Sequence, residues 1–210
     1  MDLFFFLSLI FAYLAGSISS AIIVCRLFGL PDPRTLGSHN PGATNAHRIG
    51  GKWVGFFTLF GDFLKTALPM ILVYKLDYGR EASLWVGVVA VIGHCFPIYF
   101  GFKGGKGVAS MMTVISLVIS SFAILTIGTW MLTAYTFGRS SVASLLTSIV
   151  VPFFGYHFKP DLFIPLCALS AVVLIRHRSN IANLIQGKEP LIVGRPLPAR
   201  TQVHGDSRTQ

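Results

Sequence analysis

The sequence predicts an all-α integral membrane protein, and its composition and charge pattern support this prediction. Hydrophobic residues make up 53% of the 210 residues and charged residues only 12%, about half the charged share of an ordinary soluble domain. The mean hydropathy is +0.67. A soluble globule of this size could not bury so much apolar surface, because most of its residues contact water. A disordered chain is excluded as well, because disordered chains have a low hydrophobic content.

Six apolar segments follow one another along the chain and are the candidate transmembrane helices. A full span needs about 20 apolar residues. The first segment has no basic stretch before it and no A-x-A cleavage site after it, so we expect a retained helix rather than a cleaved signal peptide. The segments cover roughly residues 3–25, 53–74, 84–100, 108–137, 142–158 and 162–175.

Basic residues gather in some connections between these segments and are balanced by acids in others. The net charge of +9 does not indicate nucleic-acid binding here, because the basic residues lie between apolar segments. The positive-inside rule places basic connections in the cytoplasm and leaves the balanced ones outside. The basic connections are 26–52, 101–107 and the region from 176 onwards; the balanced ones are 75–83 and 159–161.

The charge pattern also predicts the number of crossings. Because 101–107 and the C-terminal region are both expected inside, an even number of crossings must separate them, yet three apolar segments lie between. The run 108–137 is long for one helix, and a turn at Ser120-Ser121 would divide it into two. The prediction is seven transmembrane helices in one domain over residues 1–190, with the N-terminus outside and the C-terminus cytoplasmic. Five helices, with one short segment not spanning, satisfy the same parity.

The Pro- and polar-rich residues 191–210 are expected to form a mobile cytoplasmic tail. The three cysteines, Cys25, Cys95 and Cys167, lie in or beside apolar runs and are expected to be buried thiols. The sequence contains no H-E-x-x-H, C-x-x-C or acidic cluster, so it predicts no metal site and no cofactor.

The first polar cluster on the predicted cytoplasmic side is Gly-Ser-His-Asn-Pro-Gly-Ala-Thr-Asn at residues 37–45, followed by Arg48. Asn-Pro and Pro-Gly are turn signals, and Gly37 and Gly42 allow backbone N–H groups to face a ligand. Arg48 supplies a forked cation that suits phosphate. The alternative is a polar surface loop without a ligand. The uncharged candidate ligands are Ser38, Asn40, Thr44 and Asn45.

The second cluster is Gly-Phe-Lys-Gly-Gly-Lys-Gly at residues 101–107, which leads directly into an apolar helix from Val108. Glycines before a helix expose backbone N–H groups, and the helix dipole adds positive charge. The P-loop spacing is absent, so we expect a small phosphate ester rather than ATP. A flexible basic loop is the alternative. The candidate phosphate ligands are Lys103, Gly104, Gly105, Lys106 and Gly107.

The third cluster is Arg-His-Arg-Ser-Asn at residues 176–180, and it continues to Glu189. If this stretch is helical, His177 and Asn180 share a face. A histidine can bind phosphate or transfer a proton near neutral pH. Ser141, beside Arg139, adds a hydroxyl on the same side of the membrane.

Two charged residues, Asp62 and Lys65, lie one turn apart inside an apolar run. Charges in lipid are costly unless they are paired, so we expect a structural ion pair; lining a cavity is the alternative. His94, near the inner end of its segment, is expected to be a buried core histidine.

Three loops that carry Gly, Ser, Asn, Lys, Arg and His on one membrane face indicate a polar, phosphorylated ligand that meets a lipid-soluble partner. An enzyme is slightly favoured over a membrane transporter of a phosphorylated metabolite. The transporter fits the intramembrane charges, but it should show related halves and a site near the midplane, and the sequence indicates neither.

The three motifs, with Gly93-His94 before the second, resemble those of the bacterial acyl-phosphate:glycerol-3-phosphate acyltransferases, the PlsY family. The resemblance covers residues 3–190. It implies seven helices and transfer of a fatty acyl group from acyl phosphate to the 1-hydroxyl of glycerol 3-phosphate, giving lysophosphatidic acid and phosphate for phospholipid synthesis. It also implies no metal, a bacterial cytoplasmic (inner) membrane location, and a functional link to the enzyme that makes acyl phosphate.

Carried over by position, the resemblance implies catalytic roles for Ser38, Arg48, Lys106, His177 and Asn180, and a structural role for Glu189. One position departs from the family pattern, because His39 stands where the family usually has glycine. If that position needs a positive φ, the histidine is strained. The residues expected to bind substrate or phosphate are Gly37, Asn40, Gly42, Thr44, Asn45, Lys103, Gly104, Gly105, Gly107 and Ser141.

Overall fold

The computed structural model describes residues 2–192, and this part of the chain is helical, with no strand. The predicted tail therefore lies, from residue 193 onwards, outside the described residues. Two 3₁₀ turns, Ile98–Phe100 and Pro160–Leu162, interrupt the helices. The α-helices are α1 (Leu3–Gly16), α2 (Ser20–Leu27), α3 (Ala43–Lys75), α4 (Gly79–Cys95), α5 (Val108–Val118), α6 (Ser120–Phe137), α7 (Ser140–Phe158), α8 (Phe163–Arg176) and α9 (Arg178–Ile185).

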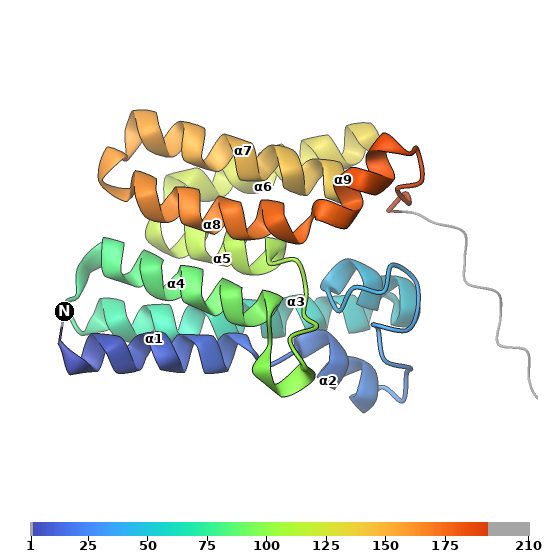
Figure 1. Ribbon diagram of the computed structural model, residues 1–210, viewed down its shortest axis with the longest axis horizontal. Coiled ribbons are helices and arrows are strands. Elements are labelled where there is room, and N and C mark those ends of the chain that lie inside the picture. The colour runs from blue at the N-terminus through green and yellow to red at the C-terminus, as the bar shows by residue number, and fades with distance from the viewer. Residues whose placement is uncertain (1, 193–210) are drawn as a thin grey trace, which may run out of the picture.

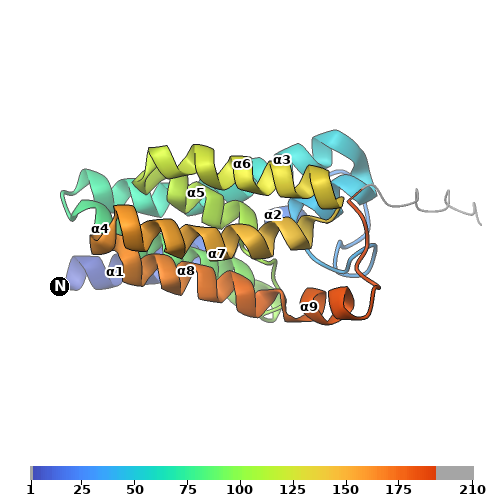
Figure 2. The same ribbon diagram turned by 90° about the horizontal axis from the view of Figure 1, so that it is seen from above.

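The long helices lie side by side with their axes roughly aligned (Figures 1 and 2). Helices α1, α3 and α4 contact one another on one side of the bundle, and α6, α7 and α8 pack in sequence on the other. Helix α5 lies between these groups and contacts α3, α4 and α6. The N-terminal end of α1 is at one end of the bundle, whereas α2, α9 and the polar loops gather at the opposite end (Figure 1).

The first apolar segment is two helices instead of the single one expected at 3–25. Helix α1 ends at Gly16 and α2 begins at Ser20. A Cβ on Gly16 would overlap the carbonyl oxygen of Ala90, so this glycine lets α1 and α4 approach closely. At the break, the ammonium of Lys65 donates to the carbonyl of Ile18 at 2.8 Å. In an unbroken helix the carbonyl of Ile18 would accept an intrahelical hydrogen bond. At the break, the ammonium of Lys65 takes the place of that donor.

Helix α3 begins at Ala43, ten residues before the expected apolar segment 53–74. Gly51 has φ 80° and ψ −171°, which is not helical, so the helix is kinked there. The piece before the kink carries Asn45 and Arg48. At this kink the piece before Gly51 folds back, so that His47 and the carbonyl of Ala43 lie against Gly55.

The predicted division of the run 108–137 is confirmed. Helix α5 ends at Val118 and α6 begins at Ser120, with Ile119 non-helical at φ −136° and ψ 81°. The break lies beside Ser120-Ser121, as the sequence predicts. With 11 residues, α5 is about 16 Å long, shorter than a bilayer core.

Several helices of the described chain are long and apolar enough to cross a membrane. Four segments meet this criterion, and α8 with α9 would be a fifth, although those two helices meet at a 55° bend. The four are Leu3–Leu27, Ala43–Lys75, Gly79–Phe100 and Ser140–Phe158. The integral membrane class follows from these segments, while the finer count of seven crossings stays a prediction.

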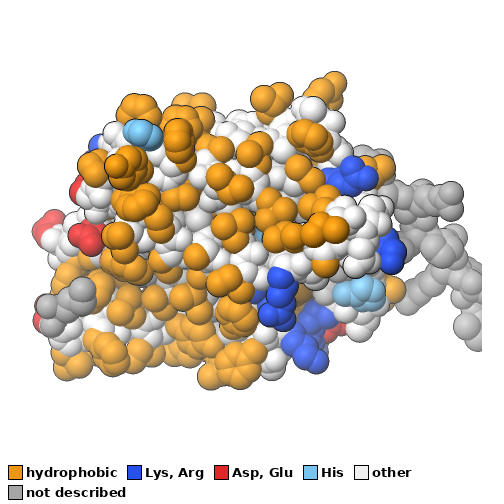
Figure 3. Space-filling model, turned by 45° about the horizontal axis from the view of Figure 1, so that its top comes forward, with side chains coloured by type: hydrophobic (Ala, Val, Ile, Leu, Met, Phe, Trp, Pro, Cys, Tyr) orange, Lys and Arg blue, Asp and Glu red, His pale blue; other side chains and the backbone are white. Residues whose placement is uncertain are grey.

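The surface has the distribution of side chains that a bilayer requires. Hydrophobic side chains cover much of the face shown in Figure 3, with most of its lysines and arginines towards one end and most of its carboxylates at the other. Large apolar side chains are exposed on several helices, for example Leu68 of α3 at 58%, Leu132 of α6 at 69% and Ile164 of α8 at 65%. Contiguous exposed apolar surface on this scale marks contact with lipid or a partner.

Candidate active site

A cavity of about 930 Å³ lies at the end of the bundle where the polar loops gather, and residues of all three motifs line it. Lys103, Gly104, Gly105 and Lys65 are not among its lining residues. The predicted site residues that line the cavity are Gly37, Ser38, Asn40, Gly42, Thr44, Asn45, Arg48, Asp62, Lys106, Gly107, Ser141, His177, Asn180 and Glu189.

Asn45 organises the first motif from inside it. Its side chain is 1% exposed. Its Oδ1 accepts from the N–H of Ser38 at 2.9 Å and from Nη1 of Arg48 at 3.3 Å. Its Nδ2 donates to the carbonyls of Pro33 and Leu36 at 2.8 and 3.0 Å. The amide thus fixes the loop that presents Ser38 and orients Arg48, although the sequence suggested only a ligand.

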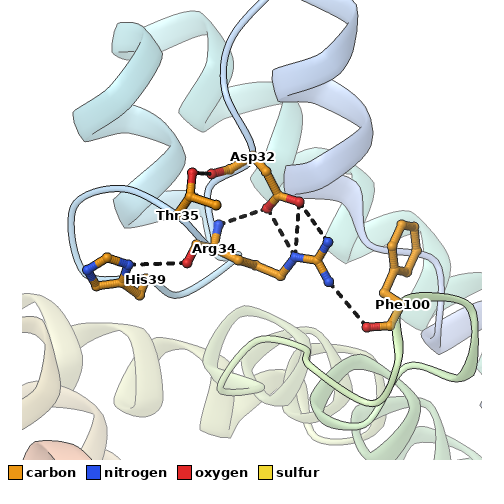
Figure 4. A network of polar contacts seen from close by, with 5 residues as sticks. All are labelled: Asp32, Arg34, Thr35, His39 and Phe100. Carbon is orange, nitrogen blue, oxygen red and sulfur yellow. Dashed lines mark hydrogen bonds and ion pairs between the residues drawn. The ribbon is translucent and has the colours of Figure 1, made fainter.

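Arg34, one of the basic residues of the connection 26–52, links the segment just before the first motif to the residue just before the second (Figure 4). It forms an ion pair with Asp32 at 2.7 Å, and hydrogen bonds from Arg34 lower the pKa of the Asp32 carboxyl. Its Nη1 donates to the carbonyl of Phe100 at 3.2 Å. The carbonyl of Arg34 lies 3.2 Å from Nδ1 of His39.

His39 has φ 56°, so this position does need a positive φ and the histidine backbone is strained. The left-handed region costs a non-glycine residue about 1 kcal/mol, less for histidine than for β-branched residues. We expect His39→Gly to keep kcat/KM within about threefold and to leave the unfolding midpoint in detergent equal or higher. His39→Val should lower both quantities. A His39→Val variant as stable and active as wild type would contradict the strain.

Two glycines of the loop at 101–107 pack against His94. Gly104 and Gly105 are buried, and a Cβ on either would overlap backbone or imidazole atoms of His94. Their carbonyls accept hydrogen bonds from Arg176 at 2.9 and 3.1 Å, and the N–H of Gly105 donates to the carbonyl of His94 at 3.1 Å. These two glycines therefore permit close packing of the loop rather than forming the cavity wall.

The two lysines of this loop are placed differently. Lys103 is exposed and lies outside the cavity lining, whereas Lys106 is half-buried and lines the cavity beside Gly107, which immediately precedes α5. Burial lowers the pKa of Lys106, Glu189 opposes this shift, and Arg176 adds to it. Lys106 is thus the cation of this loop that an anion in the cavity would meet.

The third motif is bent, not one continuous helix. His177 separates α8 from α9, and Asn180 follows one turn later, so both still line the cavity. Nδ1 of His177 lies 2.8 Å from the carbonyl of Val173. Because a carbonyl only accepts, Nδ1 carries the hydrogen and Nε2 of the neutral ring is an acceptor. Burial lowers the pKa of His177 to about 4, so the ring is neutral at pH 7.

Glu189 connects the C-terminal end of the described chain to the site. Its Oε1 accepts from Nδ2 of Asn180 at 2.6 Å, and its carbonyl accepts from Nε of Arg139 at 3.2 Å. Two residues later, the carbonyl of Leu191 accepts from Arg48 at 3.3 Å. Among the cavity-lining residues, three buried oxygen atoms have no hydrogen-bond partner within residues 2–192: Oδ1 of Asn180, Oε2 of Glu189 and Oγ of Ser141.

The predicted ion pair of Asp62 and Lys65 is present, with 2.8 Å between Oδ1 and Nζ. Nδ1 of His94 lies 3.4 Å from the same carboxylate oxygen. Asp62 and His94 also line the cavity. The two alternatives for Asp62 are therefore compatible, because one carboxylate pairs inside the bundle and reaches the cavity wall.

Beyond the polar end, the cavity is lined by apolar side chains of three helices. Phe56, Phe60 and Phe63 come from α3, Met112 from α5 and Trp130 from α6. The three phenylalanines are between 40% and 52% exposed. One cavity thus combines cationic and amide groups with exposed aromatic side chains in its wall.

A family model described as glycerol-3-phosphate acyltransferase matches residues 6–187. The chain belongs to this family. The sequence is 46% identical over 189 residues to a glycerol-3-phosphate acyltransferase of Pasteurella multocida, covering 90% of this chain and 94% of that protein. It is 45% identical over 187 residues to one of Escherichia fergusonii, covering 88% and 90%.

Solved structures agree with this membership in the acyltransferase family. The crystal structure of PlsY, an integral membrane glycerol 3-phosphate acyltransferase, in its glycerol 3-phosphate form matches with a TM-score of 0.84 and 34% identity. The lysophosphatidic acid form gives 0.82 and 33%; each match covers 89% of this chain and 94% of PlsY. The family expected from the three motifs is confirmed, and with its several apolar helices the chain is a multi-pass integral membrane protein.

Proposed function

We propose that this chain, as a glycerol-3-phosphate acyltransferase, takes a fatty acyl group from acyl phosphate and transfers it to the 1-hydroxyl of glycerol 3-phosphate. The products are lysophosphatidic acid and inorganic phosphate. The observation that carries the proposal is the convergence of three polar motifs on one cavity that also has apolar side chains of α3, α5 and α6 in its wall. A transporter of a phosphorylated metabolite does not require an apolar wall joined to the polar site.

The harder task in this reaction is to bring two anionic head groups together, since they repel. Arg48 and Lys106 line the cavity from two different motifs, and Gly107 leads into the N-terminus of α5. Cations and helix N-terminal amides offset the repulsion and orient the acceptor hydroxyl. Ser38, Asn180 and Ser141 would add hydrogen bonds to the bound phosphates.

Acyl phosphate is already activated, because phosphate is a good leaving group, so no acyl-enzyme is required. The acceptor oxygen forms the new ester bond to the acyl carbon, and the bond from that carbon to the phosphate oxygen breaks. We assign Ser38 the role of ligand. Trapping an acyl group on Ser38 would contradict this assignment.

The proton of the attacking hydroxyl goes to the departing phosphate or to His177. The low pKa of His177 makes it a weak base at neutral pH, because efficient general bases have a pKa near the working pH. When the bond to the acyl carbon breaks, its electron pair stays on the phosphate oxygen, and the added negative charge makes the departing phosphate a strong proton acceptor. The departing phosphate is therefore the better proton acceptor, and Nε2 of His177 accepts a hydrogen bond that orients the hydroxyl.

The acyl chain would lie against Phe56, Phe60 and Phe63 and reach the bilayer along this wall. We propose one domain over residues 1–190 with seven crossings, an outside N-terminus, and the site on the cytoplasmic side of a bacterial inner membrane. The basic loops at the cavity end support this orientation. A cytoplasmic mouth would also receive acyl phosphate from the enzyme that makes it.

The decisive experiment uses purified protein in detergent or lipidic mesophase with palmitoyl phosphate, glycerol 3-phosphate and EDTA. We expect phosphate release that requires glycerol 3-phosphate and yields lysophosphatidic acid. Persistence in EDTA would show that no chelatable metal is needed. No release from folded protein would favour the transporter, and flux of labelled glycerol 3-phosphate into proteoliposomes would then be measured.

The pH dependence should reflect two shifted groups. Since the pKa of His177 is lowered to about 4, its protonation should not reduce kcat/KM until the pH approaches 4. Since burial lowers the pKa of Lys106, the alkaline loss of kcat/KM should begin at a lower pH than for an exposed lysine. Rates of phosphate release between pH 4 and 10 test both points.

His177→Gln provides the control for the acid side. The variant and wild type should share the same acid limb, which then belongs to substrate phosphate. An inflection near pH ~6.5, the ordinary histidine value, present only in wild type would contradict the assignment. Strong residual activity of His177→Gln at high pH would count further against His177 as the base.

A further inference from the structure

Arg176 connects the third motif to the second through the backbone. Its Nε and Nη2 donate to the carbonyls of Gly105 and Gly104 at 3.1 and 2.9 Å. Its guanidinium carbon lies 5.0 Å from the centre of the Phe96 ring, within the range of a cation–π contact. Within residues 2–192 no carboxylate forms an ion pair with it. Arg176, a half-buried cation at a helix end, therefore donates its hydrogen bonds to two neutral carbonyls of one loop.

This arrangement fixes the direction of the neighbouring amides. In a trans peptide the C=O and the following N–H point in opposite directions. With the carbonyls of Gly104 and Gly105 turned towards Arg176, the N–H groups of Gly105 and Lys106 turn away from it. The N–H of Gly105 already donates to the carbonyl of His94. The N–H of Lys106 has no such partner within the described residues.

The cavity wall begins at this same peptide. Gly104 and Gly105 lie outside the lining, whereas Lys106 and Gly107 belong to it. A loop with glycine at 101, 104, 105 and 107 has little conformational preference of its own, because glycine loses more freedom on ordering than other residues. An external anchor must therefore supply the order, and the forked guanidinium bonds two successive carbonyls at once.

We propose that Arg176 is a positioning residue that holds the loop so that the N–H and ammonium of Lys106 face a phosphate group in the cavity. The ligand is a phosphate group, carried by glycerol 3-phosphate or by acyl phosphate. The inference rests on the proposed function for its kinetic readout but not for its binding readout. A helix-end arginine that only follows the positive-inside rule would make no difference to phosphate affinity.

The test compares Arg176→Gln and Arg176→Lys with matched variants at Arg178. Arg178 belongs to the same basic stretch, but its side chain is exposed and forms no hydrogen bond in the described chain. Lysine at 176 keeps the charge and loses the two-pronged geometry. We expect Arg176→Gln to raise the KM for one of the two substrates at least tenfold while kcat changes less than threefold. Arg176→Lys should raise it three- to tenfold, and the Arg178 variants should stay within twofold.

The substrate whose KM rises identifies the source of the phosphate. Unchanged KM values for both substrates, or equal effects at 176 and 178, would overturn the proposal. So would a loss confined to kcat.

A second readout needs no activity. Inorganic phosphate should raise the unfolding midpoint of wild type and of the Arg178 variants in detergent. It should raise the midpoint of Arg176→Lys less, and that of Arg176→Gln least. Equal shifts in all variants would overturn the positioning role even if acyl transfer is absent. Absence of acyl transfer in wild type would instead refute the proposed function. If Arg176→Gln does not fold, the Arg176→Lys arm decides alone.

Discussion

Replacing Lys106 with alanine is expected to lower kcat/KM for glycerol 3-phosphate by about 100- to 1,000-fold, the usual effect of removing one group that stabilises developing negative charge. Lys106 is the lysine of the 101–107 loop that lines the cavity. Its half-buried position strengthens its interaction with an anion, since water screens it less. The measurement is initial-rate phosphate release over a range of glycerol 3-phosphate concentrations.

Lys103→Ala is the matched control, because both lysines belong to one loop and the sequence alone suggests both as ligands. Lys103 is exposed and lies outside the cavity lining, so its removal should change kcat/KM by less than about threefold. Equal losses for the two variants would contradict the geometric distinction between them. They would favour a general effect of positive charge at the membrane surface.

Much of the arrangement could be predicted from the sequence, because charge and hydropathy act locally. The positive-inside rule calls for an even number of crossings between 101–107 and the C-terminal region, which a division of the run 108–137 provides, and the structure has the break at Ile119. The three motifs converge on one cavity, as expected if all three loops lie at one end of the bundle. Both results depend only on where apolar runs end and which residues follow them.

Features that depend on tertiary contacts could not be predicted in this way. At the break between α1 and α2, the carbonyl of Ile18 accepts a hydrogen bond from Lys65, which is 47 residues away in the sequence. Gly104 and Gly105 resemble phosphate-binding glycines, yet their missing Cβ serves close packing against His94. Both uses require the same residue type, so one sequence does not distinguish them. Arg34 and Arg176 likewise satisfy the positive-inside rule whether or not they hold a loop.

The largest effect on stability is expected at the buried ion pair. Asp62 and Lys65 are 2% and 6% exposed, and Asp62→Asn would leave the ammonium of Lys65 without its counter-ion. Breaking a buried pair by removing one partner costs about 3–5 kcal/mol, because the remaining charge is uncompensated. The unfolding midpoint in detergent should fall strongly for Asp62→Asn. The control is Asp161→Asn, at an exposed position in the connection 159–161, which should change the unfolding midpoint little.

The double variant Asp62→Asn/Lys65→Met separates the structural role of the pair from a role in the cavity. Removing both charges eliminates the uncompensated ammonium, so the double variant should be more stable than Asp62→Asn alone. If the pair is only structural, the double variant should also regain kcat per folded molecule. If Asp62 contributes to the reaction through the cavity wall that it shares with His94, stability should recover while kcat stays low. A purely structural role of Asp62 and a role in the reaction thus predict opposite relations between stability and activity in the double variant.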